Sequence, residues 1–496
     1  MALKVYNSYT RQKEIFQSIT PGHVGMYVCG PTVSGESHLG HARPYITFDV
    51  LFRYLGYKGY KVRYIRNITD AGHFEEEGRA AEDKVGKKAL LEKLEPMELV
   101  QKYTNLFHWA FNQFNCLEPS IEPTATGHIV EQIDMIKKII AEGYAYEIKG
   151  SVYFDVKKYA AQYDYGKLSG RIIDDLLSAT RELDGQEEKR DPADFALWKS
   201  AAPEHIMRWS SPWGVGFPGW HIECSAMATK YLGTEFDIHG GGMDLQFPHH
   251  ESEIAQSTIC NHTSPVRYWM HNNMITINGK KMGKSYNNVI KLTEMFTGDH
   301  PLLTQAFSPM TIRFFILQSH YRSPLDFSSE ALVASEKAFK RLWEAYSILK
   351  EFKTDETDEN GTDIFLEGKV LNWLGEFDDF MDDDLSTPKV IANMFELAPI
   401  INSLKDGLIP INALATSTIK LMQEKFQVFM ENIFGLVNEN TTGNEILQGV
   451  MRLLIDIRKE AKNKKDFATS DRIRNQLLDI GVLLKDEKNG GVNWTI

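Results

Sequence analysis

The sequence predicts an α/β protein with a parallel central sheet, and three observations support this. Residues 24–68 have the pattern of a strand, a helix and a second strand, the unit from which parallel sheets are built. Similar patterns return at Trp209, beyond a stretch of mixed β character. After Leu325, long runs of helix formers replace them. We therefore predict a Rossmann-like core with an inserted domain, followed by a helical bundle and a small C-terminal α/β module.

Turn residues delimit the first strand–helix–strand unit. Residues 24–29 are rich in β-forming side chains, and a Gly-Pro pair ends this strand. Pro44 suits the first turn of the helix that follows, and the second strand covers 61–68. The apolar face of the helix consists of Phe48, Leu51, Phe52 and Leu55. Because ligands of such sheets lie beyond the carboxyl ends of the strands, we expect a site near Cys29 and Thr69.

Later elements follow from the same patterns. Helices are predicted at 222–231 and 248–259, and two helices with a hairpin are predicted at the C-terminus. The resulting parts are 1–130 and 209–266 for the two halves of the core, 131–208 for the inserted domain, 267–325 for a connecting region with a lysine-rich loop, 326–440 for the helical bundle and 441–496 for the C-terminal module.

Composition limits the class of protein. The chain has 496 residues, of which 43% are hydrophobic and 25% charged, as in globular proteins of several domains. It has no apolar run near the ~20 residues of a membrane helix and no secretory signal pattern. Its four scattered cysteines do not suit a disulfide framework. We therefore expect a cytoplasmic protein without a membrane partner. The net charge of −12 excludes a general basic coat for nucleic acid.

Two motifs have the chemistry of a nucleotide site. His38-Leu39-Gly40-His41 lies between the first strand and its helix, whose N-terminus favours phosphate. Gly40 lets a nucleotide approach the backbone closely. Lys281 and Lys284 belong to a loop that can close on phosphates. Either motif alone is more often an exposed segment, but both together in this order predict an ATP site. A Walker-type loop is absent from the sequence, which argues against a P-loop mechanism.

A second constellation offers ligands that suit zinc. His249 and Glu253 are four residues apart, so they share one face of a predicted helix. Cys29 ends the first strand and Cys224 lies in another predicted helix, and thiolate, imidazole and carboxylate together suit zinc. The spacing alone favours a simpler interpretation, in which both cysteines are small buried apolar residues. Three neighbours compete for the ligand roles, namely His221, His250 and Glu251.

Several longer motifs resemble those of the cysteinyl-tRNA synthetases, a family of class I aminoacyl-tRNA synthetases. The two nucleotide motifs resemble the HIGH and KMSKS signatures of that class. The resemblance covers nearly the whole chain and rests on the segments Cys29–Val33, Asn67–Asp70, Pro218–Met227, Phe247–Ser257, Asp382–Leu385 and Lys465–Trp494.

The resemblance implies a cysteine–tRNA ligase activity, in which cysteine and ATP give cysteinyl-adenylate and pyrophosphate before cysteine passes to the 3′ end of tRNA(Cys). It implies one zinc ion per chain that selects the substrate thiolate, and Mg²⁺ with ATP. The implied zinc ligands are Cys29, Cys224, His249 and Glu253. The implied ATP-binding residues are Gly40 and the catalytic His38, His41, Lys281 and Lys284. The residues implied around the amino acid are Thr69, Trp220, His239 and Asp244.

Departures from the family pattern lie outside these metal ligands. Gly283 stands where serine is usual, and Phe217 stands where a basic residue is common. The segment Ala71-Gly72-His73 and an acidic insertion at 74–95 replace an acidic pair and a lysine. These differences concern the ATP pocket and its loops.

Basic residues gather near the C-terminus, where the resemblance implies contact with the anticodon side of the tRNA. They are Arg458, Lys459, Lys462, Lys464, Lys465, Arg472 and Arg474, with Trp494 in the predicted hairpin. Two solvated amphipathic helices would explain the same residues equally well.

We expect the cysteine–tRNA ligase to be a monomer. Two other functions stay open. One is ligation of cysteine to a small amine, which the long region after Leu325 disfavours. The other is a catalytically silent zinc- and RNA-binding relative, which the intact histidines and lysines of the nucleotide motifs disfavour.

Overall fold

The computed structural model describes most of the chain. The described residues are 2–71, 89, 94–171, 189–203, 205–353, 361–464, 466–479, 482–486 and 492–495. They form two compact units, Met1–Leu436 and Val437–Ile496, each with a hydrophobic core of its own. Nearly all of the acidic insertion predicted at 74–95 lies outside the described residues. Among the described helices, none is long and apolar enough to cross a bilayer.

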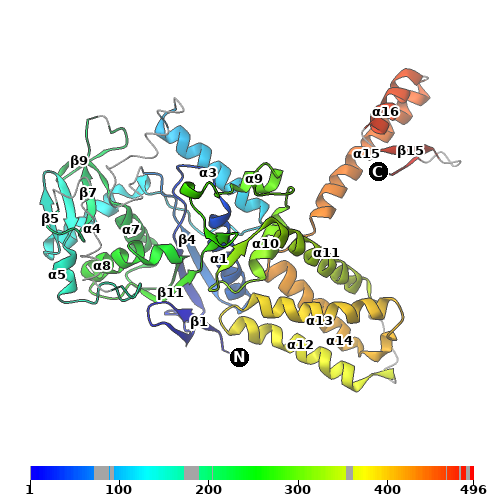
Figure 1. The fold of residues 1–496 in the computed structure, drawn as a ribbon, viewed down its shortest axis with the longest axis horizontal. Coiled ribbons are helices and arrows are strands. Elements are labelled where there is room, and N and C mark those ends of the chain that lie inside the picture. The colour runs from blue at the N-terminus through cyan, green and yellow to red at the C-terminus, as the bar shows by residue number, and fades with distance from the viewer. Residues whose placement is uncertain are drawn as a thin grey trace. The chain divides into compact units, whose positions relative to one another are not determined.

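The centre of the first unit is a four-stranded parallel sheet (Figure 1). Its strands, in order across the sheet, are β11 (Val266–Asn272), β10 (Phe236–Gly242), β3 (His23–Val28) and β4 (Lys61–Arg66). Helix α1 (Leu39–Tyr57) connects β3 to β4, as the sequence pattern predicted. The predicted fold class, an α/β protein with a parallel core sheet, is confirmed.

Alternate residues of β3 face opposite sides of this sheet, and this decides where a site can form. Met26 and Val28 belong to the main core, which also contains the buried face of α1. Tyr27 and Cys29 belong to a smaller cluster with residues of α7 (Trp220–Leu232) and α8 (His249–Asn261). The sheet therefore presents Cys29 to these two helices.

The chain between β4 and α7 contributes an antiparallel sheet, in the order β5, β6, β7, β9, β8. Its strands are β5 (Ala145–Ile148), β6 (Ser151–Phe154), β7 (Phe195–Ser200), β8 (Trp209–Ser211) and β9 (Gly214–Pro218). Helix α4 (Ile129–Ala141) contacts α7 and α8. The strand β9 of this sheet ends at Pro218, whereas the inserted domain is predicted to end at 208. The domain boundaries stay predictions.

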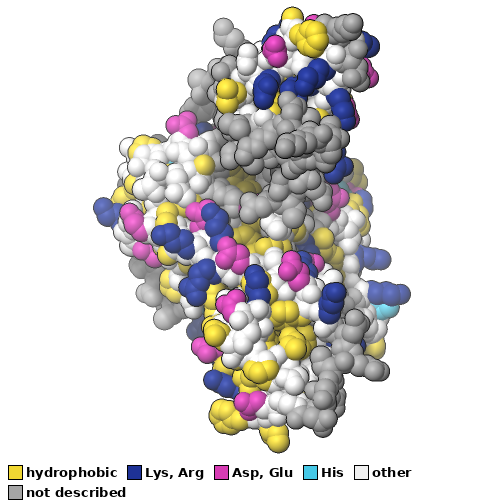
Figure 2. Space-filling model, turned by 90° about the vertical axis from the view of Figure 1, so that its right-hand side faces the viewer, with side chains coloured by type: hydrophobic (Ala, Val, Ile, Leu, Met, Phe, Trp, Pro, Cys, Tyr) yellow, Lys and Arg dark blue, Asp and Glu magenta, His cyan; other side chains and the backbone are white. Residues whose placement is uncertain are grey.

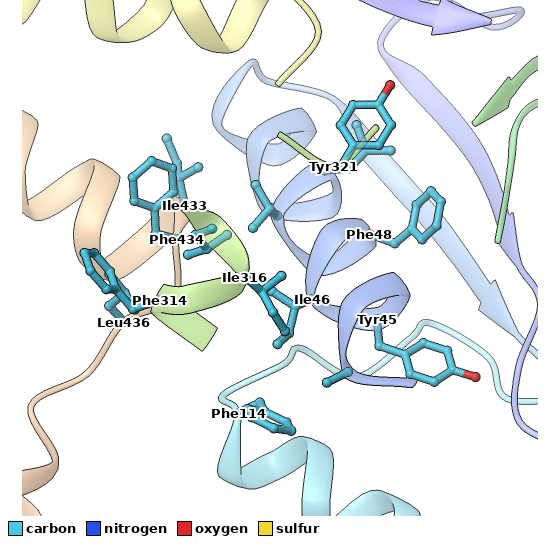
Figure 3. Close-up of a cluster of buried hydrophobic side chains, with 14 of the residues drawn as sticks. Tyr45, Ile46, Phe48, Phe114, Phe314, Ile316, Tyr321, Ile433, Phe434 and Leu436 are labelled. Carbon is cyan, nitrogen blue, oxygen red and sulfur yellow. The ribbon is translucent and has the colours of Figure 1, made fainter. Parts of the chain in front are cut away.

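A hairpin, a small sheet and a helical bundle complete the first unit (Figure 1). The strands are β1 (Lys4–Asn7), β2 (Gln12–Ile15), β12 (Ile275–Ile277), β13 (Lys280–Lys281) and β14 (Leu325–Phe327). The principal helices are α3 (Pro96–Gln113), α9 (Leu292–Thr297), α10 (Pro309–Leu317), α11 (Ser329–Glu351), α12 (Ile364–Asp382), α13 (Thr387–Lys405) and α14 (Thr416–Phe426). Figure 3 shows Ile46 and Phe48 of α1 in one cluster with Ile316 of α10 and with Phe434, beyond α14. This cluster fixes α1 between the parallel sheet and the bundle.

The second unit is the small α/β module that the sequence predicted. It consists of α15 (Glu439–Asn463), α16 (Phe467–Asp479) and an antiparallel hairpin of β15 (Leu483–Asp486) and β16 (Val492–Thr495). Its core contains Met451, Leu477, Val482 and Leu484. The side chains of Lys465 and Trp494 lie outside the described part of the chain.

Candidate metal and nucleotide site

Four residues from three distant segments meet at the end of β3. Cys29, Cys224, His249 and Glu253 each offer one ligand atom, and these atoms all lie within 4.8 Å of one another. All four side chains are buried. The end of β3 supplies Cys29, α7 supplies Cys224, and the first turns of α8 supply His249 and Glu253. We call this set the thiol cluster.

The distances within the thiol cluster suit a shared metal ion. The two Sγ atoms are 4.0 Å apart, and two thiolates ~2.3 Å from a tetrahedral ion would lie about 3.8 Å apart. His249 Nε2 is 3.1 Å from Glu253 Oε1. The other ring nitrogen of His249, Nδ1, is 2.9 Å from His221 Nδ1. Histidines that ligate metals are commonly held in this way through their second nitrogen.

The charges of the thiol cluster are strongly coupled. Burial raises the pKa of Cys29, while the hydrogen bond from Cys29 lowers the pKa of Cys224 to about 7. Burial would lower the pKa of His249, but the charges of Glu253 and Cys224 raise it to about 10. Burial would raise the pKa of Glu253, but His239 and His249 lower it to about 2. Glu253 is therefore ionised beside a protonated His249, and a metal ion bound here would take the place of the protons on His249 and on the two thiols.

A second group of candidate ligands overlaps the first. Cys29, His239, His250 and Glu253 also offer atoms within 4.8 Å of one another. His250 Nε2 lies 3.2 Å from Cys29 Sγ, and its Nδ1 lies 2.8 Å from His271 Nε2. The geometry therefore keeps His250 as an alternative ligand.

The other two competitors have different surroundings. His221 is directed at His249 rather than at the two cysteines. Glu251 accepts hydrogen bonds from the backbone N–H groups of Gly166, Leu168 and Ser169 at 2.9 to 3.3 Å. Its carboxylate holds the loop at 166–169 and is not part of either metal group.

Two of the four residues expected around the amino acid, Trp220 and His239, contact the thiol cluster, and Asn67 links Thr69 to it. Thr69 donates a hydrogen bond to Glu223 Oε2 at 2.9 Å. The Trp220 ring lies 4.4 Å from the ring of His249, and His239 Nε2 lies 2.9 Å from Glu253 Oε2. Asp244 is exposed on a short 3₁₀ helix, Met243–Gln246, and its charge helps to raise the pKa of Cys29.

Sequence reasoning missed two polar residues of this region. Asn67 Oδ1 accepts a hydrogen bond from Gly30 N at 2.9 Å and lies 3.8 Å from Cys224 Sγ. His271 lies 2.8 Å from both His250 and Ser8 Oγ. Asn67 directly follows β4, and His271 lies near the carboxyl end of β11. A position at the carboxyl end of a core strand is the signal that could have identified both residues.

The first nucleotide motif forms the N-terminal turn of α1. The helix begins at Leu39, so the prediction that Pro44 lies in its first turn is wrong. His38 caps the helix instead, since its Nδ1 accepts a hydrogen bond from Gly40 N at 3.2 Å. His41 Nδ1 accepts from His38 N at 3.1 Å, and the two rings stack at 3.8 Å. Burial and the nearby His38 lower the pKa of His41 to about 3, so this ring is neutral near pH 7.

The second nucleotide motif lies against the first. A Cβ atom added to Gly40 would lie 2.6 Å from Met282 Cε and 3.0 Å from the His38 ring. Lys281 is exposed in β13, and its carbonyl oxygen accepts from Asn288 Nδ2 at 3.0 Å. The side chain of Lys284 lies outside the described residues. The fold therefore brings together two motifs that are about 240 residues apart in the chain.

Comparisons with known proteins identify the family. The family model for the class I (C) tRNA synthetase catalytic domain matches residues 15–337, and a DALR domain model matches 376–438. A cysteine–tRNA ligase of Bacteroides fragilis is 58% identical over 491 residues, which cover 98% of each chain. One from Porphyromonas gingivalis is 54% identical over 497 residues, covering 100% of this chain and 99% of the other. The chain belongs to the cysteine–tRNA ligase family.

Solved structures share the fold at low sequence identity. The Agrobacterium radiobacter LeuRS–tRNA–LeuAMS complex has a TM-score of 0.58 at 10% identity, covering 84% of this chain and 85% of the other. Mycobacterium tuberculosis methionyl-tRNA synthetase with methionyl-adenylate has a TM-score of 0.54 at 12% identity, covering 83% and 89%. These distant structures support the fold alone. The family model and the two cysteine–tRNA ligases confirm the resemblance that the motifs indicated.

The structure shows the surroundings of two residues that depart from the cysteine–tRNA ligase pattern, Gly283 and Phe217. A Cβ atom at Gly283 would approach no atom closer than 3.6 Å, so the usual serine would also fit there. Phe217 is buried, and its ring stacks on His205 at 4.4 Å.

Proposed function

We propose that this chain is an active cysteine–tRNA ligase that joins L-cysteine to tRNA(Cys) at the expense of ATP. The observation that carries the proposal is the buried thiol cluster at the end of β3, which is followed along the chain by a nucleotide motif at the start of α1, in a member of this family. A thiol-selective pocket and an ATP-activating helix terminus are the two things that cysteinyl-adenylate formation requires.

The thiol cluster would hold the zinc ion through Cys29, Cys224, His249 and Glu253. The support for this set over the one with His250 is its second thiolate, because the Sγ atoms of Cys29 and Cys224 lie 4.0 Å apart, close to the separation of two thiolates on one tetrahedral zinc ion. When bound, zinc would supply a soft Lewis acid that prefers a thiolate to a hydroxyl group and so favours cysteine over serine. The protein contributes the burial that excludes water and the fixed positions of the four donors.

The chain's own groups would activate ATP, which binds as its magnesium complex. The N-terminus of α1 and the His38 and His41 rings would meet the phosphates, where negative charge grows as the cysteine carboxylate attacks. Lys281 and Lys284 would neutralise the β- and γ-phosphates as the loop closes. Gly40 would let the nucleotide lie close to the backbone. Because His41 is neutral near pH 7, it would act as a hydrogen-bonding group rather than as a charge.

The amino acid would lie between the thiol cluster and this helix terminus. Thr69, Trp220 and His239 would line its pocket, and the Asp244 carboxylate would attract its ammonium group. Thr69 is already oriented by its hydrogen bond to Glu223.

The parts after the catalytic core would bind the tRNA. The region 267–325 would contact its acceptor stem, and the bundle at 326–440 and the module at 441–496 would hold its anticodon side. On the face drawn in Figure 2, Lys and Arg side chains are interspersed with Asp and Glu, so RNA contact there would depend on local groups. We also propose that the enzyme acts in the cytoplasm as a monomer.

One assay series tests the function. We expect cysteine-dependent exchange of pyrophosphate into ATP, charging of bulk tRNA with cysteine, and one zinc per chain by elemental analysis of unchelated protein. Exchange without charging would favour a ligase with a small amine as acceptor. Absence of exchange in metal-loaded protein would leave the silent zinc- and RNA-binding relative.

A further inference from the structure

Three consecutive aspartates form the corner between α12 and α13, and each contacts a different element. Asp382 accepts a hydrogen bond from Tyr54 Oη at 2.8 Å and lies 3.0 Å from Lys58 Nζ, so it holds the C-terminal end of α1. Asp383 forms an ion pair with Lys13 of β2 at 2.8 Å. We call residues 382–385 the aspartate corner.

Asp384 is the most enclosed member of the aspartate corner. Its side chain is fully buried, and three donors surround it. Its carboxylate accepts from Tyr6 N at 2.8 Å, Tyr321 Oη at 2.6 Å and Arg322 Nε at 2.7 Å. The corner thus gathers the N-terminal hairpin, the segment after α10 and, through Asp382, helix α1.

The backbone of the aspartate corner has a conformation that its residue types do not favour by themselves. Asp384 has φ of 71° and Leu385 has φ of 57°, both in the left-handed region. Aspartate tolerates that region, but a leucine seldom adopts it, and such backbones persist where surrounding contacts over-determine them. The tertiary contacts of the three aspartates therefore set the angle between α12 and α13.

Helix α1 connects the aspartate corner to the nucleotide motif. Its N-terminal turn holds His38, Gly40 and His41, and its C-terminal turns hold Tyr54 and Lys58, which bind Asp382. A helix of 19 residues is about 28 Å long. It can therefore transmit the position of the corner to the nucleotide motif as a rigid rod.

We propose that Asp382 and Asp384 are positioning residues that set the orientation of the helical bundle relative to the nucleotide motif. An RNA held along the bundle is thereby aligned so that its 3′ end reaches the adenylate. The inference rests on the proposed cysteine–tRNA ligase activity. A purely stabilising role for the corner would affect all substrates alike, whereas a positioning role affects only an RNA long enough to touch the bundle.

The test compares two RNA substrates in Asp384→Asn. Asparagine keeps one oxygen for Tyr6 N and Tyr321 but turns an amide N–H₂ group toward Arg322, which frees the corner on one side. We expect pyrophosphate exchange and the charging of a short RNA with only the acceptor end to stay within about twofold of wild type. The kcat/KM for full-length tRNA should fall at least about tenfold, because a misplacement of about 1 Å can cost up to about a hundredfold.

Two further variants and the wild-type protein make the outcome unambiguous. Lys58→Ala removes the ion pair between α1 and Asp382, and it does so at a partly exposed position. We expect the same selective loss with full-length tRNA, so this variant tests the proposal if Asp384→Asn does not fold. Asp406→Asn, the same change at an exposed position of the bundle, should leave both RNAs unaffected. Equal losses for the two RNAs, or no loss for either, would overturn the proposal. A wild-type protein without pyrophosphate exchange would instead refute the proposed function.

Discussion

The thiol cluster and the lysine loop at 280–285 are constructed in opposite ways. The cluster is buried, and hydrogen bonds to His221, His239 and Asn67 hold its members from several sides. The loop exposes the side chains of Lys280 and Lys281, whose backbone pairs with β12. Asn288 and Met282 provide further contacts of the loop. Recognition of a thiol needs donors at fixed distances, whereas neutralising a triphosphate needs cations that can approach and withdraw.

The largest expected effect concerns the thiol cluster. In Cys224→Ser a harder hydroxyl replaces a thiolate, so zinc should be lost and the kcat/KM for cysteine in pyrophosphate exchange should fall at least about a hundredfold. His250→Asn tests the alternative ligand group and should retain zinc. Loss of zinc from His250→Asn but not from Cys224→Ser would assign the metal to the group with His239 and His250.

The next effect concerns the loop. Lys281→Ala should lower the kcat of pyrophosphate exchange by about a hundredfold, because a cation that stabilises transition-state charge is removed. Its zinc content and its KM for cysteine should equal those of wild type. Lys280→Ala is the matched control on the same short strand and should have a small effect. If both variants behave alike, the loop contributes only a general positive charge.

The contact between the two nucleotide motifs gives a smaller effect. An added methyl group in Gly40→Ala would meet Met282 Cε at 2.6 Å and the His38 ring at 3.0 Å. We expect the KM for ATP to rise about tenfold, because the loop and the helix terminus can no longer approach each other. Since Met282 ends in a flexible methyl group, Gly40→Ala with Met282→Ala should recover part of this loss. No recovery would show that the His38 ring carries the clash.

Sequence patterns predicted those parts that depend on local rules. The parallel core, the α1 connection and the end of β3 followed from periodicity and turn residues, and Cys29 followed from the rule for strand ends. Long-range relations were not predictable from spacing. The 4.0 Å approach of Cys29 to Cys224 depends on the packing of α7 against the sheet, and the choice between His249 and His250 depends on the rotation of α8.

Pro44 illustrates a local rule that failed. A proline within a helix usually marks its first turn, but here α1 begins five residues earlier. The side chain of His38 provides the cap that permits this start, and histidine is not among the common capping residues. The extra turn is what places Gly40 and His41 at the helix terminus, so the exception to the pattern is part of the proposed nucleotide site.

The smallest expected effect is on stability and comes from His41. Its pKa of about 3 lies below the ordinary value of 6.5, because burial and His38 disfavour its charged form. The unfolded chain therefore binds a proton as the pH falls through 6.5, while the folded chain does not until about pH 3. Stability is full above pH 6.5 and is lost progressively below it. An unscreened shift would cost ~2 kcal/mol at pH 5, and partial exposure of the ring should reduce this to about 1 kcal/mol.

His41→Asn isolates this contribution, because the Asn oxygen can still accept the hydrogen bond from His38 N without binding a proton. Its free energy of unfolding should fall less than that of wild type between pH 7 and pH 5, by about 1 kcal/mol in urea titrations. His262→Asn changes a histidine that is 69% exposed and should follow the wild-type curve. Parallel curves for His41→Asn and wild type would mean that the ring is as well solvated in the folded chain as in the unfolded one. His41 would then take up a proton near pH 6.5, and its proposed role as a neutral hydrogen-bonding group would not hold below that pH.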